Sequence, residues 1–441
     1  MLKQTKTNQL WQLVFVTVIS RVSLFNSIGY IANAFFRKGV VKMKVYINDA
    51  IVAVKNPFEN KIFIYDRLNK IEFNINEDTF EILKDIKNNN YTKNDLIEIF
   101  PEEFIESLFE MNILTIKKQK NINNVKELTK YNNARIFVEL TEKCNLKCQH
   151  CYGNFECKKV NSLNIERLKT IIDNASKSGV YQFDITGGEP LLYKNIEELL
   201  EYAYNSGMLV RIFTNLTLYN NKFRDMILKY GVKDIVTSID SCNEEEHDKF
   251  RGQNGSFKKT IRAIQDLKKY DLNISVNTMI GNHNKNHIPE LIEFLQNLNV
   301  KSVLDVIVPE GRAQSLNENI IESANIIKNI YKEYYDIINH EAISINCGIG
   351  NRFVYIKSNG NIYICPSLIY DEYKLGDISN FDTFSTWREM NNKFSGLHCD
   401  RENKLCKKCT GGCRARALKL NGNINSKDDV YCIINKVGEK V

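Results

Sequence analysis

Three cysteines lie close together in the sequence, and their spacing is its strongest chemical signal. Cys144, Cys148 and Cys151 follow the pattern C-x3-C-x2-C. A segment this short can supply three thiolates to one iron–sulfur cluster, whereas an ordinary four-iron cluster takes four protein thiolates. The missing ligand would leave one iron open to a molecule from solution.

Zinc is the alternative metal for these thiolates. A closed structural zinc site needs four protein ligands, so a fourth residue would have to join the three cysteines. His150 is one candidate. It directly precedes Cys151, however, and adjacent side chains rarely point at the same metal ion. The pattern therefore favours an iron–sulfur cluster.

The stretch from Cys144 to Tyr152, CNLKCQHCY, resembles the cluster loop of the radical S-adenosylmethionine (SAM) family. The resemblance implies a 4Fe-4S cluster whose open iron is chelated by the amino and carboxylate groups of SAM. One electron then cleaves the sulfonium and yields a 5′-deoxyadenosyl radical, which abstracts hydrogen from a substrate. His150 fits the family preference for His or an aromatic residue before the third cysteine.

Alternating strands and helices are predicted to position this loop over residues 134–312. Six segments read as strands, and an amphipathic stretch such as 165–175 lies between each pair. This alternation predicts an α/β fold with a parallel sheet and outer helices, and the family has a partial barrel of six such units. The predicted strands are Ala134–Thr141, Tyr181–Thr186, Val210–Thr214, Asp234–Asp240, Asn273–Ile280 and Ser302–Val308.

The strand ends carry further candidate residues, where βα loops of such barrels hold the chemistry. Gly187-Gly188-Glu189-Pro190 matches the GGEP motif of the family, which meets the amino group of SAM. Thr214-Asn215 ends the third strand, and Ser238 and Asp240 share one side of the fourth, which suits the two hydroxyls of a ribose. Arg251 matches an arginine that pairs with the SAM carboxylate; its alternative role is a surface ion pair. Asn277 and Pro309–Arg312 resemble SAM-pocket positions, and His247 is more simply a polar loop residue.

Seven cysteines follow residue 346. The order Cys347, Gly360, Cys365 fits the first half of a SPASM extension, and Gly376-Asp377-Ile378 and Gly411-Gly412-Cys413 also resemble it. The resemblance implies one or two auxiliary 4Fe-4S clusters. The first would be held by Cys347, Cys365 and Cys413. The second would be held by Cys399, Cys406, Cys409 and Cys432. The family pattern C-x2-C-x5-C-x3-C differs from the x6, x2 and x3 gaps found here, so Cys399 and Cys406 align by count only. Zinc is the alternative at Cys406 and Cys409, and Cys157 and Cys242 are left over, although Cys157 could face the substrate.

Residues 43–116 form a predicted N-terminal unit. Val45–Val54 and Lys61–Phe73 are predicted strands, followed by three short helices that begin near Asn76, Thr92 and Pro101. The order resembles a winged-helix peptide recognition element, which binds the leader of a precursor peptide as an added strand. Alternative roles for this unit are a structural cap and a DNA-binding wing. Its many acidic residues argue against binding to nucleic acid. Residues 117–133 are most simply a solvated linker.

Three further segments complete the chain. Residues 1–42 contain an apolar run interrupted by Arg21 and are interpreted as a wrong start, with Met43 as the true one, or as an amphipathic membrane helix. Residues 313–346 are a predicted connecting helix, and 347–441 the SPASM-like domain. The net charge of +7 over 441 residues does not indicate nucleic-acid binding. The clustering of twelve cysteines at short spacings in a large chain is typical of metal binding in a reducing compartment, which predicts a cytoplasmic, anaerobic setting.

The sequence thus predicts a radical SAM enzyme that acts on a peptide or protein, for example by forming a thioether cross-link. A low-potential electron donor such as flavodoxin or ferredoxin is the expected redox partner. Alternative enzymes are a sulfatase-maturase-type protein oxidase and a modifier of haem or another small cofactor. The alternatives from other classes are an iron–sulfur electron carrier and a metal-binding module, against which the GGEP turn and the open three-cysteine loop argue.

Overall fold

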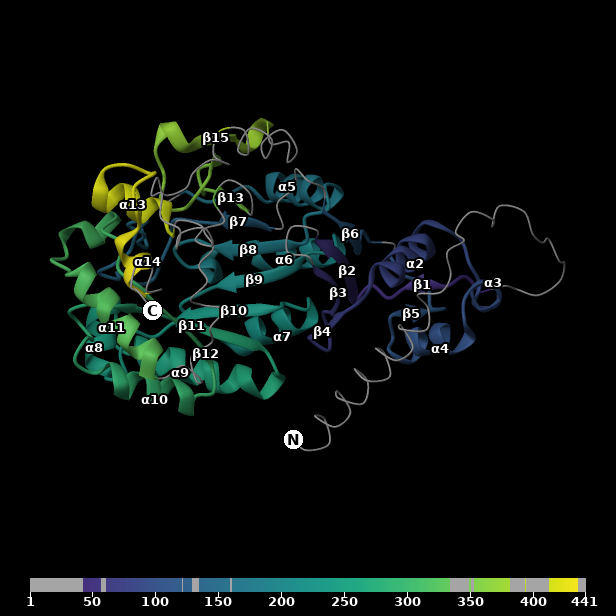
Figure 1. Cartoon of the computed structure of the whole chain (residues 1–441), viewed down its shortest axis with the longest axis horizontal. Coiled ribbons are helices and arrows are strands. Elements are labelled where there is room, and N and C mark those ends of the chain that lie inside the picture. Colours follow the sequence, from purple (N-terminus) through teal and green to yellow (C-terminus); the bar gives the residue numbers. More distant parts are fainter. Residues whose placement is uncertain are drawn as a thin grey trace, which may run out of the picture. The chain divides into compact units, whose positions relative to one another are not determined.

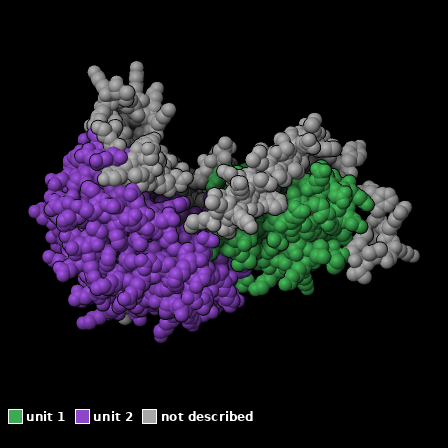
Figure 2. Space-filling model, turned by 90° about the horizontal axis from the view of Figure 1, so that it is seen from below, with its two compact units in different colours: residues 1–130, 205–207 green, residues 131–204, 208–441 purple. Residues whose placement is uncertain are grey.

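The structure is a computed structural model in which the chain divides into two compact units (Figure 2). Unit 1 comprises residues 1–130 and 205–207, and unit 2 comprises 131–204 and 208–441. The residues that the structure describes are 43–56, 61–120, 122–128, 135–158, 161–333, 349, 353–380, 393 and 412–434. The predictions for residues 1–42 lie outside this part of the chain.

Unit 1 contains two sheets, an antiparallel pair and a mixed sheet of four strands. β1 (Tyr46–Ile47) pairs with β5 (Leu114–Thr115), and a second sheet has the order β4-β3-β2-β6. The strands of this sheet are β2 (Ile51–Asn56), β3 (Lys61–Asp66), β4 (Ile71–Asn74) and β6 (Val125–Glu127).

Each of the two long strands predicted for unit 1 is interrupted by a turn. In the first, the side chain of Asn48 accepts a hydrogen bond from the backbone N–H of Ala50 (3.0 Å). In the second, one carboxylate oxygen of Asp66 accepts from the backbone N–H groups of Leu68 (2.9 Å) and Asn69 (3.0 Å). Asn and Asp side chains stabilise turns in this way, so the prediction of one unbroken strand was wrong in both cases.

The three predicted helices of unit 1 are confirmed, and each begins directly after the residue predicted to lie at its start. Asn76 caps α2 (Glu77–Asn88) by accepting from the N–H of Thr79. Thr92 and Asp95 form the predicted capping box of α3 (Lys93–Ile99), and Pro101 precedes α4 (Glu102–Glu110). The buried faces of these helices, including Phe80 and Phe104, form a core with the strands.

The prediction of a solvated linker over 117–133 was wrong for residues 122–128. β6 pairs in parallel with β2, and Asn124, Lys126 and Leu128 are buried. The amide of Asn124 donates to the backbone carbonyl of Ile51 (2.9 Å). Alternate residues of this polar stretch therefore enter the unit, a pattern that its Lys and Asn content concealed.

Unit 2 contains a sheet of the order β12-β11-β10-β9-β8-β7-β13-β14-β15 (Figure 1). Strands β7 to β12, the first six of unit 2 in chain order, pair in parallel with one another and confirm the six predicted segments. Their bounds are β7 Arg135–Glu139, β8 Gln182–Thr186, β9 Leu209–Phe213, β10 Asp234–Ser238, β11 Asn273–Ile280 and β12 Lys301–Val306.

Helices connect these strands and bury their apolar faces against one side of the sheet, where Ile136, Phe183 and Ile212 join the main core. This is the layer arrangement expected for an α/β fold. The helices are α5 Ile165–Lys177, α6 Ile196–Asn205, α7 Asn221–Lys229, α8 Glu244–Arg251, α9 Ser256–Leu267, α10 Ile288–Asn297 and α11 Ile320–Glu333. Short 3-10 helices are Pro190–Leu192, Lys268–Tyr270, Gly311–Ser315, Asp371–Tyr373 and Ile378–Asn380.

The C-terminal part extends the same sheet. β13 (Phe353–Ile356) pairs in parallel with β7, and β14 (Asn361–Tyr363) pairs antiparallel with β13 and with β15 (Lys374–Asp377). Gly360 has a φ of +92° in the β13–β14 turn, as the predicted hairpin requires. The helices α13 (Arg414–Asn421) and α14 (Asp429–Ile434) follow. No helix in the described ranges is long and apolar enough to cross a membrane.

Candidate active site

The three-cysteine loop follows β7 and is bonded to the C-terminal end of α8. The backbone N–H of Lys147 donates to the carbonyl of Arg251 (3.2 Å), and that of Gln149 to the carbonyl of Phe250 (2.9 Å). The side-chain amide of Gln149 also donates to the carbonyl of Lys249 (3.2 Å). The loop is therefore held by a helix that follows it by about a hundred residues.

The thiols of this loop lie in apolar surroundings. Cys144 is buried with Leu146 and Phe155, and Cys148 and Cys151 pack against them. Burial raises the pKa of the Cys144 thiol far above its usual range. Burial also raises the pKa of Cys148, against an opposing effect of the Arg251 charge. Thiols of this kind become thiolates when a metal supplies positive charge.

The donor set fits a cubic iron–sulfur cluster. Its three cysteines lie on one loop, and the thiolates of such a cluster bind different irons, so they need not converge on one point. A single ion would need convergent ligands, and within the described residues no group of three His, Cys, Asp or Glu side chains forms such a site.

The GGEP turn after β8 packs directly on the start of the cysteine loop. The N–H groups of Gly188 and Glu189 donate to the carbonyls of Thr141 and Lys143, both at 2.7 Å. A Cβ atom on Gly188 would lie 2.2 Å from the Lys143 carbonyl oxygen. Only glycine permits this approach, and Pro190 begins the short helix that follows.

The carboxylate of Glu189 is fully buried and has three donors. It accepts from the hydroxyl of Thr214 (2.7 Å) and from the N–H groups of Leu191 (3.0 Å) and Asn215 (2.8 Å). Burial raises its pKa to about 7 although these donors act in the opposite direction. Glu189 thus joins the ends of β8 and β9, and its contact with the amino group of SAM stays a prediction.

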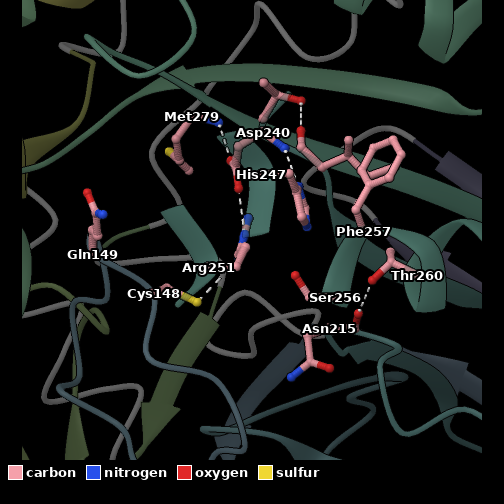
Figure 3. Close-up of polar contacts among 12 residues, drawn as sticks. Cys148, Gln149, Asn215, Asp240, His247, Arg251, Ser256, Phe257, Thr260 and Met279 are labelled. Carbon is pink, nitrogen blue, oxygen red and sulfur yellow. Dashed lines mark hydrogen bonds and ion pairs between the residues drawn. The ribbon is translucent and has the colours of Figure 1, made fainter. Parts of the chain in front are cut away.

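Asn215 lies between the cysteine loop and β9. Its side-chain amide donates to the side chain of Asn145 in the loop (3.0 Å), and Asn145 donates to the hydroxyl of Thr217 (2.7 Å). The backbone carbonyl of Asn215 accepts from the hydroxyl of Thr260 on α9 (2.9 Å; Figure 3). The predicted residue is therefore in the site, where it fixes the loop.

Asp240 and Arg251 form a buried ion pair beside Cys148 (Figure 3). The Nε of Arg251 donates to Oδ2 of Asp240 (2.5 Å), and Nη1 lies 3.8 Å from the Cys148 sulfur. The other Asp240 oxygen accepts from the N–H of Met279 (3.2 Å). Burial alone would raise the pKa of this carboxyl, but the Arg251 charge and nearby imidazoles hold it well below its usual range.

Two sequence predictions concern this pair. Asp240 is 0% exposed and each of its carboxylate oxygens accepts a hydrogen bond from the protein, and its contact with a ribose stays a prediction. Arg251 is not a surface residue, because only 8% of it is exposed. Its pairing with the SAM carboxylate stays a prediction, since Nη1 is directed at the sulfur.

Ser238 and Asn277 are brought side by side. Ser238 is the last residue of β10, and Asn277 lies within β11. The two are direct partners in the register of these strands. Both are partly exposed, in contrast to Asp240. A hydroxyl and an amide that are adjacent and accessible can bind the polar groups of a ligand, which keeps both residues as candidates.

The segment 309–312 fastens the other end of the cysteine loop. Arg312 donates from Nε to the carbonyl of Cys148 (2.8 Å) and from Nη1 to that of Phe155 (3.1 Å). Gly311 has a φ of +57°, and a Cβ there would lie 2.3 Å from the carbonyl oxygen of Cys151. This segment therefore supports the loop.

A stack of three rings beside the loop was not predicted. Phe250 lies between the imidazoles of His150 (ring centroids 4.6 Å apart) and His283 (3.6 Å). Burial lowers the pKa of His150 to about 3 and that of His283 to about 4, so both rings are neutral near pH 7. His247 was predicted as a polar loop residue, but it is buried on α8 and accepts from the N–H of Asp240 (3.3 Å).

A second unpredicted network joins the cysteine loop to β13. Glu139, at the end of β7, accepts hydrogen bonds from the hydroxyls of Tyr355 and Ser358. Tyr152, which follows Cys151 in the sequence, lies next to Tyr355 and Thr186. No sequence motif marks Glu139 or Tyr355, and only their pairing across β7 and β13 reveals them.

Three of the seven C-terminal cysteines are described. Cys365 accepts from the N–H of Ser367 (3.4 Å). The N–H of Cys413 donates to the carboxylate of Asp428 (2.8 Å), and that of Cys432 to its backbone carbonyl (3.0 Å). The other four lie outside the described residues: Cys347, Cys399, Cys406 and Cys409.

The two remaining cysteines have separate places. Cys157 is exposed, and its thiol donates to the carbonyl of Cys144 (3.0 Å). Cys242 is partly buried against the main core. That both are bystanders stays a prediction, and so does a substrate-facing role for Cys157.

Comparison with known proteins agrees with this geometry. Residues 138–295 match the model of the radical SAM superfamily. The chain is similar to the antilisterial bacteriocin subtilosin biosynthesis protein AlbA of Bacillus subtilis, with 28% identity over 306 residues that cover 64% of this chain and 67% of AlbA. It is also similar to an AdoMet-dependent heme synthase of Methanosarcina barkeri, with 28% identity over 67% of this chain and 95% of the synthase.

Among solved structures, the fold is similar to that of SuiB from Streptococcus suis, determined in complex with its precursor peptide SuiA. The TM-score is 0.60, the sequence identity is 16%, and the match covers 88% of this chain and 99% of SuiB.

Proposed function

Because this chain is an enzyme of the radical SAM superfamily, we propose that it matures a ribosomally made peptide. The superfamily uses a 4Fe-4S cluster together with SAM, and when bound the two supply a radical that abstracts hydrogen from the substrate. The cofactor carries the difficult chemistry, while the protein orients and shields the reactants.

The observation that carries the proposal is the set of three thiols held in one apolar loop by three separate elements. The end of α8, the GGEP turn and the segment 309–312 each bond to the backbone of this loop. In the proposed complex Cys144, Cys148 and Cys151 hold the cluster. Ser238 and Asn277 are accessible for SAM, and Glu189 and Asp240 fix the residues around it.

A peptide substrate is supported by the similarity to a bacteriocin biosynthesis protein and by the fold shared with a peptide-bound enzyme. In unit 1 the strand β4 is at one edge of its sheet in the described residues. A leader peptide can add to such an edge as a further strand. We place the leader along β4 and assign unit 1 the role of a winged-helix-like recognition unit.

The C-terminal part is proposed to hold one or two auxiliary 4Fe-4S clusters. Cys365 and Cys413 are partly buried and accessible as ligands of the first, and Cys432 belongs to the second. The remaining ligands of both would be the four cysteines named above. The target bond is proposed to be a thioether, the electron donor a flavodoxin or ferredoxin, and the compartment the cytoplasm.

A small porphyrin-type substrate is the second candidate. The observation that favours it is the heme synthase relative, 95% of which is covered by the match. A porphyrin has no leader segment, so it gives unit 1 no binding role. The two candidates therefore differ in what a change at β4 would do.

The first experiment measures 5′-deoxyadenosine released from SAM by anaerobically reconstituted protein with dithionite. Product is expected from the wild type and only background from Cys144→Ala, Cys148→Ala and Cys151→Ala, because each change removes a cluster ligand. Cys242→Ala, which changes a cysteine outside the loop, is the matched control. Equal product from the loop variants would refute the catalytic assignment.

The second experiment tests the leader site with Asn74→Pro. The N–H of Ile75 donates to the carbonyl of Ile62 (3.0 Å), so by the alternation of antiparallel pairing the N–H of Asn74 faces away from β3. Proline removes that outward donor and is tolerated on edge strands. We expect KM for a leader-containing peptide to rise about five- to tenfold, as one lost hydrogen bond implies.

Asn74→Ala keeps the N–H and is the control, with KM expected to be unchanged. SAM cleavage without peptide should be equal in both variants. If Asn74→Pro leaves KM for the peptide unchanged, the leader does not bind along β4. Turnover of a porphyrin by both variants, with no turnover of peptide, would favour the second candidate.

A further inference from the structure

A buried positive charge faces the cysteine loop. Arg251 is buried, and its guanidinium lies between a carboxylate on one side and a thiol on the other (Figure 3). Its Nε is 2.5 Å from Oδ2 of Asp240, and its Nη1 is 3.8 Å from the sulfur of Cys148. An arginine stays protonated in proteins, so this is a fixed positive charge.

The position of the guanidinium is determined from several sides. Asp240 accepts from the N–H of Met279 on β11 (3.2 Å) and donates its own N–H to His247 on α8 (3.3 Å). Its backbone carbonyl accepts from the side chain of Asn284 (2.7 Å). Asp240 is therefore immobilised by two neighbouring elements, and it holds Arg251 by the Nε, which leaves Nη1 directed toward Cys148.

The carboxylate does not cancel the effect of Arg251 on the sulfur. Asp240 lies on the side of the guanidinium opposite to Cys148 (Figure 3), and Coulomb energy falls with distance. The nearer, positive charge therefore dominates at the sulfur. In surroundings that exclude water this interaction is screened less than on the surface.

We propose that Arg251, positioned by Asp240, is the electrostatic partner of the Cys148 thiolate and raises the reduction potential of the catalytic cluster. Reduction adds one electron to a centre whose thiolates are already negative. A cation beside one of these thiolates favours the reduced form. Charge and hydrogen bonds near the sulfurs are known determinants of cluster potentials.

This role differs from binding the SAM carboxylate, and the two can be measured separately. A carboxylate partner changes the affinity for SAM. A thiolate partner changes the potential of the cluster in the absence of SAM. The inference rests on the proposed function, because it requires the cluster at Cys144, Cys148 and Cys151.

The test is a redox titration of reconstituted protein without SAM, followed by electron paramagnetic resonance. The signal of the catalytic cluster is identified as the one that SAM alters. In Arg251→Gln we expect the ratio of reduced to oxidised cluster at a fixed potential to fall about tenfold, which is about 59 mV for a one-electron couple. Arg262→Gln, an exposed arginine on α9, makes the same change in net charge and should leave the ratio unchanged.

Arg251→Lys is the second variant. An ammonium keeps the charge but cannot reach Asp240 and Cys148 at once as the guanidinium does, so a shift of the same sign and smaller size is expected. If Arg251→Gln does not retain the cluster, Arg251→Met takes its place as the neutral variant, and a wild-type potential in that variant overturns the proposal.

The remaining outcomes separate this inference from the proposed function. A wild-type protein that binds no cluster at the three cysteines refutes both. A normal wild-type cluster with an unchanged potential in Arg251→Gln refutes only the role of Arg251. Weaker SAM binding without a shift in potential would assign Arg251 to the SAM carboxylate instead.

Discussion

Two buried arginine–aspartate pairs lie beside cysteines in unit 2, and they are oriented differently. In the Arg251–Asp240 pair the arginine faces the sulfur of Cys148. In the Arg416–Asp428 pair the arginine is bonded twice to Asp428 (2.8 and 2.7 Å) and once to Asp305 (3.0 Å). There the carboxylate faces the cysteine, because Asp428 accepts from the N–H of Cys413.

The difference shows that the same ion pair can serve two purposes. At Cys148 a cation is presented to a sulfur, where it can affect electron uptake. At Cys413 the cation has two carboxylate partners and also interacts electrostatically with the Cys413 thiol, and the pair fixes the backbone of the cysteine and the start of α14. Both cations act on a thiol, but only the second pair also fixes the backbone of its cysteine through the carboxylate, which leads to predictions that differ in kind and size.

The largest expected effect is on stability at the C-terminal pair. Arg416→Met would leave the fully buried carboxylate of Asp428 without its cation, and breaking a buried pair in this way costs about 3–5 kcal/mol. Hydrogen exchange of the α13 and α14 amides, followed by mass spectrometry, should show this loss. Arg262→Met on the surface is the control. Exchange as slow as in the wild type would show that the pair is not structural.

A smaller effect is expected when the Arg251–Asp240 pair loses its carboxylate. Asp240→Asn keeps the shape of the side chain but weakens its hold on Arg251, at a cost of about 2 kcal/mol. The amides of Lys147 and Gln149 bond to the carbonyls at the end of α8, so their exchange should accelerate about 30-fold. Unchanged exchange at these two amides would mean that Asp240 does not support the loop.

A buried cation in unit 1 provides the smallest effect and a test without any cysteine. Burial, together with the Arg67 charge, lowers the pKa of Lys126 to about 7, whereas an unfolded lysine has a pKa of about 10.4. Between these values the unfolded state binds more protons, so the stability of unit 1 should rise with pH. The expected gain is about 1 kcal/mol from pH 7 to pH 8.

Pulse proteolysis in urea at the two pH values measures this gain. Lys126→Met removes the titrating group, so the stability of the variant should not rise over the same interval. A wild type whose stability falls from pH 7 to pH 8 would show that Lys126 is held in its charged form. The arginines of unit 2 are protonated throughout this range and should contribute no slope.

Much of the fold was predictable because local patterns and tertiary packing agree. The six parallel strands of unit 2 have apolar runs separated by amphipathic helices, and all six were found. The helix starts at Asn76 and Thr92 were found because capping depends on residues within one turn. The prediction of a solvated linker was wrong because Asn124 and Lys126, although polar, are buried where this segment pairs with β2.

The candidate site was predictable to the extent that its residues belong to motifs. The sequence indicated the loop of Cys144, the turn of Glu189 and the position of Arg251. It did not indicate that Asp240 would be occupied by Arg251, or that Glu139 and Tyr355 would meet. Glu139 and Tyr355 are far apart in the chain, Asp240 and Arg251 are 11 residues apart, and no spacing rule describes either contact.

The sequence by itself determined the donor set and the order of the elements, since thiol spacing and hydrophobic periodicity are local properties. Only the tertiary structure decided which charges face which sulfurs. Asp240 reaches both Met279 and Arg251 because β10, β11 and α8 converge at one end of the sheet. The balance of charge at Cys148 follows from that convergence, because electrostatic interactions depend on distances in space and on burial.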